Sequence, residues 1–193
     1  MSRRRLILWL LPLVLIACSK GTTPWHSPAI SGVMPDLAFH LTDDSGRAVT
    51  AADYSGKVTL LYFGFTHCQD VCPETLTLLA SAIRRLGDDA NKVQVLFVSV
   101  DPKRDTPAVL HRYAAYFSPG IVGLTGTDPQ LQTLSKRYRV SYSYGKPDAK
   151  GNYEVYHSSA IFAFDARGKI RLLMNQKESA AAIAADLKRL IAS

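Results

Sequence analysis

The chain has little of what nucleic-acid binding or membrane spanning requires. Its 193 residues carry a formal net charge of +7, but no run of basic residues is interleaved with aromatic ones, so we expect no nucleic-acid partner. The apolar run from Leu6 to Ala17 has twelve residues, fewer than the roughly 20 that a helix needs to cross a bilayer. No internal repeat is present. The length and an apolar fraction of 47% fit one globular domain.

The N-terminus has the pattern of an export signal instead. Three arginines, Arg3 to Arg5, precede the apolar run, and removal of residues 1–17 would lower the net charge to +4. The residues Leu15 to Cys18 resemble the lipobox of bacterial lipoproteins. The resemblance implies lipid on Cys18 and a membrane-anchored protein that faces the periplasm or another extracytoplasmic space. Cleavage at another position and an uncleaved anchor are the alternatives.

The chain has only three cysteines, and lipidation of one of them would leave a pair. With Cys18 acylated, Cys68 and Cys72 remain as a pair. In an oxidising compartment this pair could be a structural disulfide, but a bridge that closes so short a loop gains little stability. A functional thiol pair is therefore the preferred interpretation.

Both cysteines lie where a buried strand gives way to a helix. Apolar residues recur at the spacing of one helical face from Pro73 to Leu86, and proline suits a first helical position. Counting back in fours from Leu76 gives Cys72 and Cys68, so both thiols extend the buried stripe. At the positive end of the helix dipole, we expect their pKa values to be lowered.

Residues 34–193 are predicted to form an α/β domain of the thioredoxin-like type, with an N-terminal β-hairpin, an extra helix and a central mixed sheet flanked by helices. Residues 18–33, rich in Ser, Thr, Pro and Gly, are predicted to be a flexible tether after the lipidated cysteine, with His26 solvated. The predicted strands are a hairpin over residues 37–49, two buried parallel strands at 57–65 and 93–100, and a hairpin of strands 161–164 and 170–174, with a possible further hairpin at 142–151. One further helix is predicted to start at Pro107, with Asp105 or Thr106 as its cap. Two more helices are predicted at 128–138 and 178–191.

Seven stretches together resemble the Sco/SenC family of copper chaperones, over residues from about 35 to 190. They are Gly56 to Val58, Phe63 to Thr66, Cys68 to Pro73, Asp101 to Pro107, Gly126-Thr127, Tyr138 to Val140, and Tyr153 to Ser158. The resemblance implies a thioredoxin-like fold and copper held by Cys68, Cys72 and His157. Family members often have proline where this chain has Gln69, and a different residue where His67 places a second imidazole.

His157 lies 85 residues after Cys72, so only the fold can bring it to the thiols. In thioredoxin-like proteins, the loop before the antiparallel strand pair packs against the cysteine motif. Here His157 opens that loop. Asp101 ends a buried strand at the edge where α/β ligand sites form, so it either supports the site or is a turn residue. His67 is expected to be a solvated neighbour, with a ligand role as the alternative. Asp70 is expected to be solvated, with a weak role in tuning the thiols or in meeting a partner.

The donor set favours copper, because copper(I) prefers thiolates and imidazole suits both copper states. The resemblance implies delivery of copper to the dinuclear copper site of a cytochrome c oxidase by ligand exchange, with the copper-accepting oxidase subunit as partner. The alternative is a thiol–disulfide oxidoreductase in which Cys68, the more exposed thiol, attacks and Cys72 resolves. That activity would need a protein that reduces the thiols. Peroxidase activity and zinc binding are further alternatives.

Overall fold

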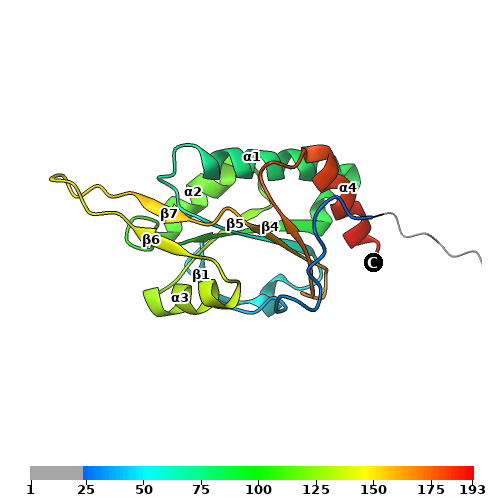
Figure 1. Ribbon diagram of the computed structural model, residues 1–193, viewed down its shortest axis with the longest axis horizontal. Coiled ribbons are helices and arrows are strands. Elements are labelled where there is room, and N and C mark those ends of the chain that lie inside the picture. The colour runs from blue at the N-terminus through cyan, green and yellow to red at the C-terminus, as the bar shows by residue number, and fades with distance from the viewer. Residues whose placement is uncertain (1–23) are drawn as a thin grey trace, which may run out of the picture.

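The structure is a computed structural model, and it describes residues 24–193 (Figure 1). A seven-stranded mixed sheet runs through its centre in the order β2-β1-β5-β4-β3-β8-β9. Its three central strands are parallel, and the other pairings are antiparallel. The strands are β1 (His40–Asp43), β2 (Ala48–Thr50), β3 (Val58–Gly64), β4 (Val93–Ser99), β5 (Ile121–Thr125), β8 (Ile161–Phe164) and β9 (Ile170–Met174).

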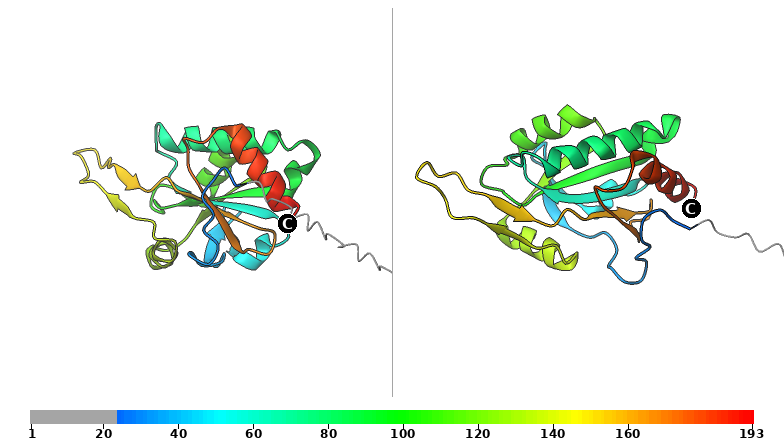
Figure 2. Two further views of the ribbon diagram at one scale, coloured as in Figure 1. Left: turned by 45° about the vertical axis from the view of Figure 1, so that its right-hand side comes forward. Right: turned by 45° about the horizontal axis from the view of Figure 1, so that its top comes forward.

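The predicted thioredoxin-like arrangement is confirmed, with helices on both faces of the sheet (Figures 1 and 2). α1 (Val71–Arg84), α2 (Pro107–Phe117) and α4 (Ala180–Ile191) lie on one side, and α3 (Asp128–Arg137) lies on the other. Two short 3-10 helices, η1 (Ala51–Tyr54) and η2 (Gly87–Lys92), join strands to their neighbours. Within residues 24–193, no helix combines the length and apolar character needed to cross a membrane.

α1 and α4 each start two residues from the predicted position, whereas α2 starts at Pro107 as predicted. α1 begins at Val71, before Pro73, because the first N–H groups of a helix have no partner within it and a proline is tolerated at any of these positions. Thr106 is the residue that caps α2, and its hydroxyl accepts a bond from the Val109 N–H at 3.4 Å. Thr127, not Asp128, caps α3.

A second, two-stranded sheet carries the last predicted site residue. β6 (Tyr142–Tyr144) pairs with β7 (Val155–His157), and His157 lies opposite Tyr142. This confirms the possible hairpin, although its return strand lies beyond Gly151. The hairpin, which spans residues 142–157, projects from one end of the molecule (Figures 1 and 2).

The predicted tether is wrong for residues 24–33, because this segment packs against the domain. Ser27 is buried, and its N–H donates to the Asp186 carboxylate at 2.8 Å. Trp25 lies under the Arg189 guanidinium, 3.8 Å from the carbon to the ring centroid, while His26 is exposed as predicted. These partners are some 160 residues away along the chain, so composition alone could not show them. The predicted signal segment, Cys18 and the rest of the tether lie outside the described residues.

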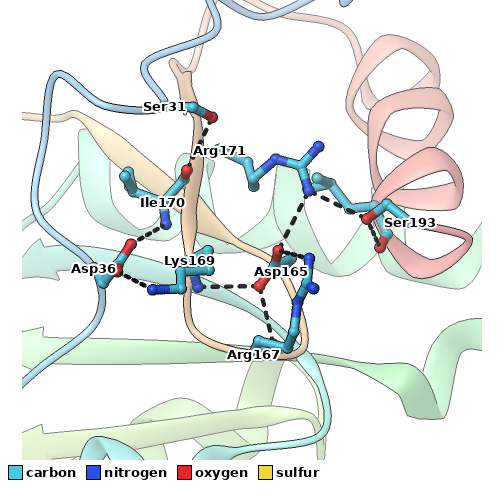
Figure 3. Close-up of polar contacts among 9 residues, drawn as sticks. Ser31, Asp36, Asp165, Arg167, Lys169, Ile170, Arg171 and Ser193 are labelled. Atoms are coloured by element: carbon cyan, nitrogen blue, oxygen red, sulfur yellow. Dashed lines mark hydrogen bonds and ion pairs between the residues drawn. The ribbon is translucent and has the colours of Figure 1, made fainter.

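The turn between β8 and β9 ties several distant segments together (Figure 3). The buried Asp165 carboxylate accepts bonds from the N–H groups of Arg167 at 2.9 Å and Lys169 at 3.0 Å. Asp36, just before β1, accepts bonds from the Lys169 amine at 2.7 Å and the Ile170 N–H at 3.1 Å. The chain that leads into the sheet is thereby fixed to its far edge.

Candidate metal centre

The two cysteines lie between the end of β3 and the first turn of α1. Cys72 is fully buried and Cys68 is half-buried, and both are free thiols. The Cys72 N–H donates to the Cys68 sulfur at 3.3 Å. The expectation that Cys68 is the more exposed thiol is confirmed, and the structure holds no disulfide between the two.

His157 reaches the thiols from the end of β7. Its Nε2 lies 3.3 Å from the Cys72 Sγ. Its Nδ1 lies 2.9 Å from the Ser158 carbonyl oxygen, which can only accept, so Nδ1 carries the proton and Nε2 presents a lone pair to the sulfur. The ring packs edge-on against Phe65, with the centroids 5.7 Å apart. Backbone and aromatic contacts therefore orient Nε2 toward the cysteines.

The three donor atoms fit a single metal ion. One ligand atom each from Cys68, Cys72 and His157 lie within 4.8 Å of one another. Sulfur and imidazole ligands lie about 2.0–2.3 Å from a metal such as zinc, so donors that share one ion are at most about 4.6 Å apart. The three donor atoms therefore need to move only slightly closer together to bind one metal ion. Two sulfurs and one nitrogen form a soft set that suits copper(I).

Burial decides the protonation of this cluster. It raises the pKa of Cys72 to about 12, against an expected lowering, because removal of the sulfur from water outweighs the hydrogen bond to the Phe65 backbone. The prediction of a lowered pKa is therefore wrong for Cys72. Burial also lowers the pKa of His157 below its ordinary value, although the bond to Ser158 opposes this. At neutral pH the centre holds a protonated Cys72 thiol and a neutral imidazole.

The other predicted site residues stand outside the donor cluster. His67 is exposed, with its Nδ1 3.2 Å from the Thr66 hydroxyl. Asp70 is exposed at the N-cap of α1. Both border a cavity of about 780 Å³ onto which Cys68 and His157 open. Asp101 is buried and accepts a bond from the Tyr153 hydroxyl at 2.6 Å, so it holds the hairpin and contacts neither thiol.

Two supporting residues escaped the sequence analysis. Asp105, considered only as a helix cap, is buried and accepts bonds from the Thr66 N–H at 2.9 Å and from the Thr66 and Ser99 hydroxyls at 2.6 Å each. It thereby fixes the turn that carries Cys68. Arg104 pairs with Asp101 and lies 3.9 Å from the Tyr153 ring centroid. The only signal was their place beside Asp101 at the end of a buried strand.

A thioredoxin-like sheet with two free thiols at a helix start, and an imidazole brought over them by a hairpin, defines a domain built to hold a soft metal ion. The family comparison agrees with this class. The chain belongs to the SCO1/SenC family, whose model matches residues 34–192.

The relatives show how far the likeness extends. The chain is 41% identical to "Protein SCO2 homolog, mitochondrial" of Bos taurus over 157 residues, which are 80% of this chain but 59% of the relative. The structure of Bradyrhizobium japonicum ScoI with copper bound is 40% identical, with a TM-score of 0.74, and covers 81% of this chain and 99% of that one. A SCO1/SenC family lipoprotein from Bacillus anthracis is 28% identical, with a TM-score of 0.67, over 80% of this chain and 94% of that one.

Proposed function

We propose that this protein is a copper metallochaperone that binds copper through Cys68, Cys72 and His157. The observation that carries the proposal is the convergence of these three donors within 4.8 Å. The copper-bound structure of the Bradyrhizobium japonicum relative supports the choice of metal. The copper-accepting subunit of a cytochrome c oxidase, with its dinuclear copper site, is the proposed recipient.

The geometry favours transfer by ligand exchange. A three-donor set leaves copper(I) open to a further ligand, and the cavity beside Cys68 gives an incoming thiolate access to it. We propose that a recipient thiolate bonds to the copper first, and that the half-buried Cys68 then leaves and takes up a proton. The half-buried His157 and the buried Cys72 are released last, as a second recipient ligand bonds to the copper and Cys72 takes up a proton. No change of copper oxidation state is needed in this sequence.

We further propose that the protein is exported and anchored by lipid on Cys18 after removal of residues 1–17, with residues 34–193 as the copper-binding domain. The support is the Leu15 to Cys18 pattern together with the lipoprotein from Bacillus anthracis in the same family. Metabolic labelling with a radioactive fatty acid tests this, because wild type should be labelled and Cys18→Ser should not.

An anaerobic copper(I) titration of the reduced protein against a chromophoric competitor tests the metal site. We expect one copper per chain in wild type, loss of binding in Cys68→Ala/Cys72→Ala, and an affinity lower by at least tenfold in His157→Ala. His67→Ala is the matched control, because it removes the neighbouring imidazole that lies outside the cluster, and it should bind as wild type does. Stoichiometric binding by the double cysteine variant would refute the proposal.

The alternative function, a thiol–disulfide oxidoreductase, predicts a different result for the His157→Ala variant. Thiol–disulfide exchange needs only the two sulfurs, so it should survive His157→Ala. If His157→Ala reduces a recipient disulfide normally and binds copper as wild type does, the second function replaces the first.

A further inference from the structure

Tyr62, on β3, has a hydroxyl that the proposed function does not yet explain. Its side chain is fully buried, and its hydroxyl forms no well-aligned hydrogen bond among the described residues, although the Thr75 hydroxyl and the Cys72 sulfur are its near polar neighbours. A buried hydroxyl without a partner lowers the stability of the fold, and such groups are rare in native proteins. The position of this hydroxyl therefore needs a physical reason.

The Tyr62 side chain projects toward two donors of the centre, Cys72 and His157. Tyr62 and Gly64 lie two residues apart on β3 and so face the same side of the sheet. A Cβ atom on Gly64 would lie 2.8 Å from the Cys72 Sγ, which places the sulfur against that side. The Tyr62 ring also meets the His157 ring edge-on, with the centroids 6.3 Å apart.

The protonation of the Cys72 sulfur explains why the Tyr62 hydroxyl lacks a good hydrogen bond in the metal-free protein. In the metal-free protein, the Cys72 thiol faces the lone pair of His157 Nε2, as the tautomer of His157 requires. A neutral thiol is only a weak acceptor, so it offers the phenol little. When copper bonds to Nε2 and to the sulfur, the thiol proton leaves to solvent and the sulfur becomes a thiolate. A thiolate accepts a strong, charge-assisted hydrogen bond.

We propose that Tyr62 is a positioning residue whose hydroxyl donates a hydrogen bond to the Cys72 sulfur in the copper-loaded protein. The inference rests on the proposed copper function. It adds to the copper site a supporting residue that is not one of the three ligands. Hydrogen bonds to a coordinating sulfur tune the reduction potential of copper. Tyr62 therefore favours the thiolate form of Cys72 and favours copper(I) over copper(II).

Tyr62→Phe removes the hydroxyl and keeps the ring, and Tyr113→Phe is its matched control. Tyr113, on α2, also has a buried hydroxyl without a partner in the described part of the chain. Its ring lies 5.5 Å from the same Phe97 that Tyr62 contacts at 6.0 Å, measured between centroids. The His157 ring packs against Tyr62, whereas Tyr113 packs against Phe97 and Phe117.

We expect Tyr62→Phe to bind copper(I) about tenfold more weakly than wild type. Its sulfur-to-copper(II) absorption band should shift to lower energy, and its metal-free stability toward urea should be unchanged or higher. Tyr113→Phe should match wild type in affinity and absorption. Equal affinities and spectra in all three proteins would overturn the inference and leave the proposed function intact. A stability loss in metal-free Tyr62→Phe would also overturn it, because the hydroxyl would then be structural. Absence of copper(I) binding by wild type would overturn both.

Discussion

Gly64 shows how little space surrounds the buried sulfur. A Cβ atom there would lie 2.6 Å from the Phe97 ring and 2.8 Å from the Cys72 Sγ, so a methyl group must displace one of them. We expect Gly64→Ala to lower the free energy of unfolding by about 1–3 kcal/mol, the usual cost of overpacking, and to weaken copper binding as the sulfur moves. Denaturant unfolding and the copper(I) competition assay measure the two effects.

Gly120→Ala is the control for that substitution. Its nearest neighbours are 3.8 Å from the added Cβ, which is ordinary contact, and it needs no positive φ. It should change neither stability nor copper affinity appreciably. Equal effects at the two glycines would show that the Cys72 sulfur has room to move.

The two thiols should differ strongly in reactivity. Cys72 is fully buried and its pKa is raised to about 12, whereas Cys68 borders the cavity. Because only the thiolate is alkylated, iodoacetamide at pH 8 should modify Cys68 in Cys72→Ser at least about 100-fold faster than Cys72 in Cys68→Ser. Mass spectrometry over time measures both rates. Urea should abolish the difference, and similar rates in the folded proteins would contradict the described burial.

At this scale the sequence could identify the two cysteines but not their chemical state. The helical spacing from Leu76 correctly predicted that Cys72 faces the core. That same burial raises its pKa, and the expectation of a lowered pKa did not take this burial into account. The environment of Asp105 was hidden for a similar reason, because its three hydrogen bonds come from residues on β4 and on the turn after β3.

The β6–β7 hairpin is the element on which His157 depends, and Arg104 holds it. The Arg104 guanidinium pairs with the buried Asp101, donates to the Tyr153 carbonyl at 3.2 Å and lies over the Tyr153 ring. Arg104→Ala leaves Asp101 without its cation, which should cost about 3 kcal/mol of stability. It should also loosen the hairpin and weaken copper binding several-fold.

Amide hydrogen exchange checks the hairpin separately from the metal. Exchange at residues 153–157 should be faster in Arg104→Ala, whereas Lys103→Ala, an exposed neighbour, should leave it unchanged. Unchanged exchange together with unchanged copper affinity would show that the hairpin is held by its other contacts.

Elements with strong periodicity were predicted, and those defined by pairing were not. The nearly continuous apolar runs of β3 and β4 identify buried strands. β5 was missed, since five residues with Gly123 at the centre become a strand only through their pairing with β4 and β1. The parallel core is therefore three strands wide, where the sequence indicated two.

Acid stability involves the whole molecule, because the partners of Asp165 reach both ends of the chain (Figure 3). Asp165 bonds to Lys169 and Arg171; Lys169 also bonds to Asp36 before β1, and Arg171 also bonds to Ser193 at the C-terminus. Burial alone would raise the pKa of Asp165, but the N–H groups of Lys169 and Arg167 and the nearby arginines outweigh it and lower that pKa. A carboxyl that binds its proton less readily when folded stabilises the fold above its unfolded pKa of about 3.9 and loses that contribution as the pH falls through and below this value.

Asp165→Asn should therefore lower the free energy of unfolding at pH 7 by about 1–3 kcal/mol and flatten its decline between about pH 5 and pH 3. Urea unfolding at a series of pH values measures both. Asp88→Asn, at an exposed position in η2, is the control and should keep the wild-type profile. A wild-type slope in Asp165→Asn would assign the acid sensitivity to other carboxyls.

The packing of residues 24–33 against α4 and β9 has a consequence for how the protein would work at a membrane. The first described residues lie beside α4, and the hairpin leaves the molecule at the opposite end (Figures 1 and 2). With lipid on Cys18, Pro24 lies six residue steps from the anchor, which is about 20 Å of fully extended chain. The domain would thus stand close to the bilayer with its cargo held on the outward end, suited to a recipient whose copper site rises above the lipid surface.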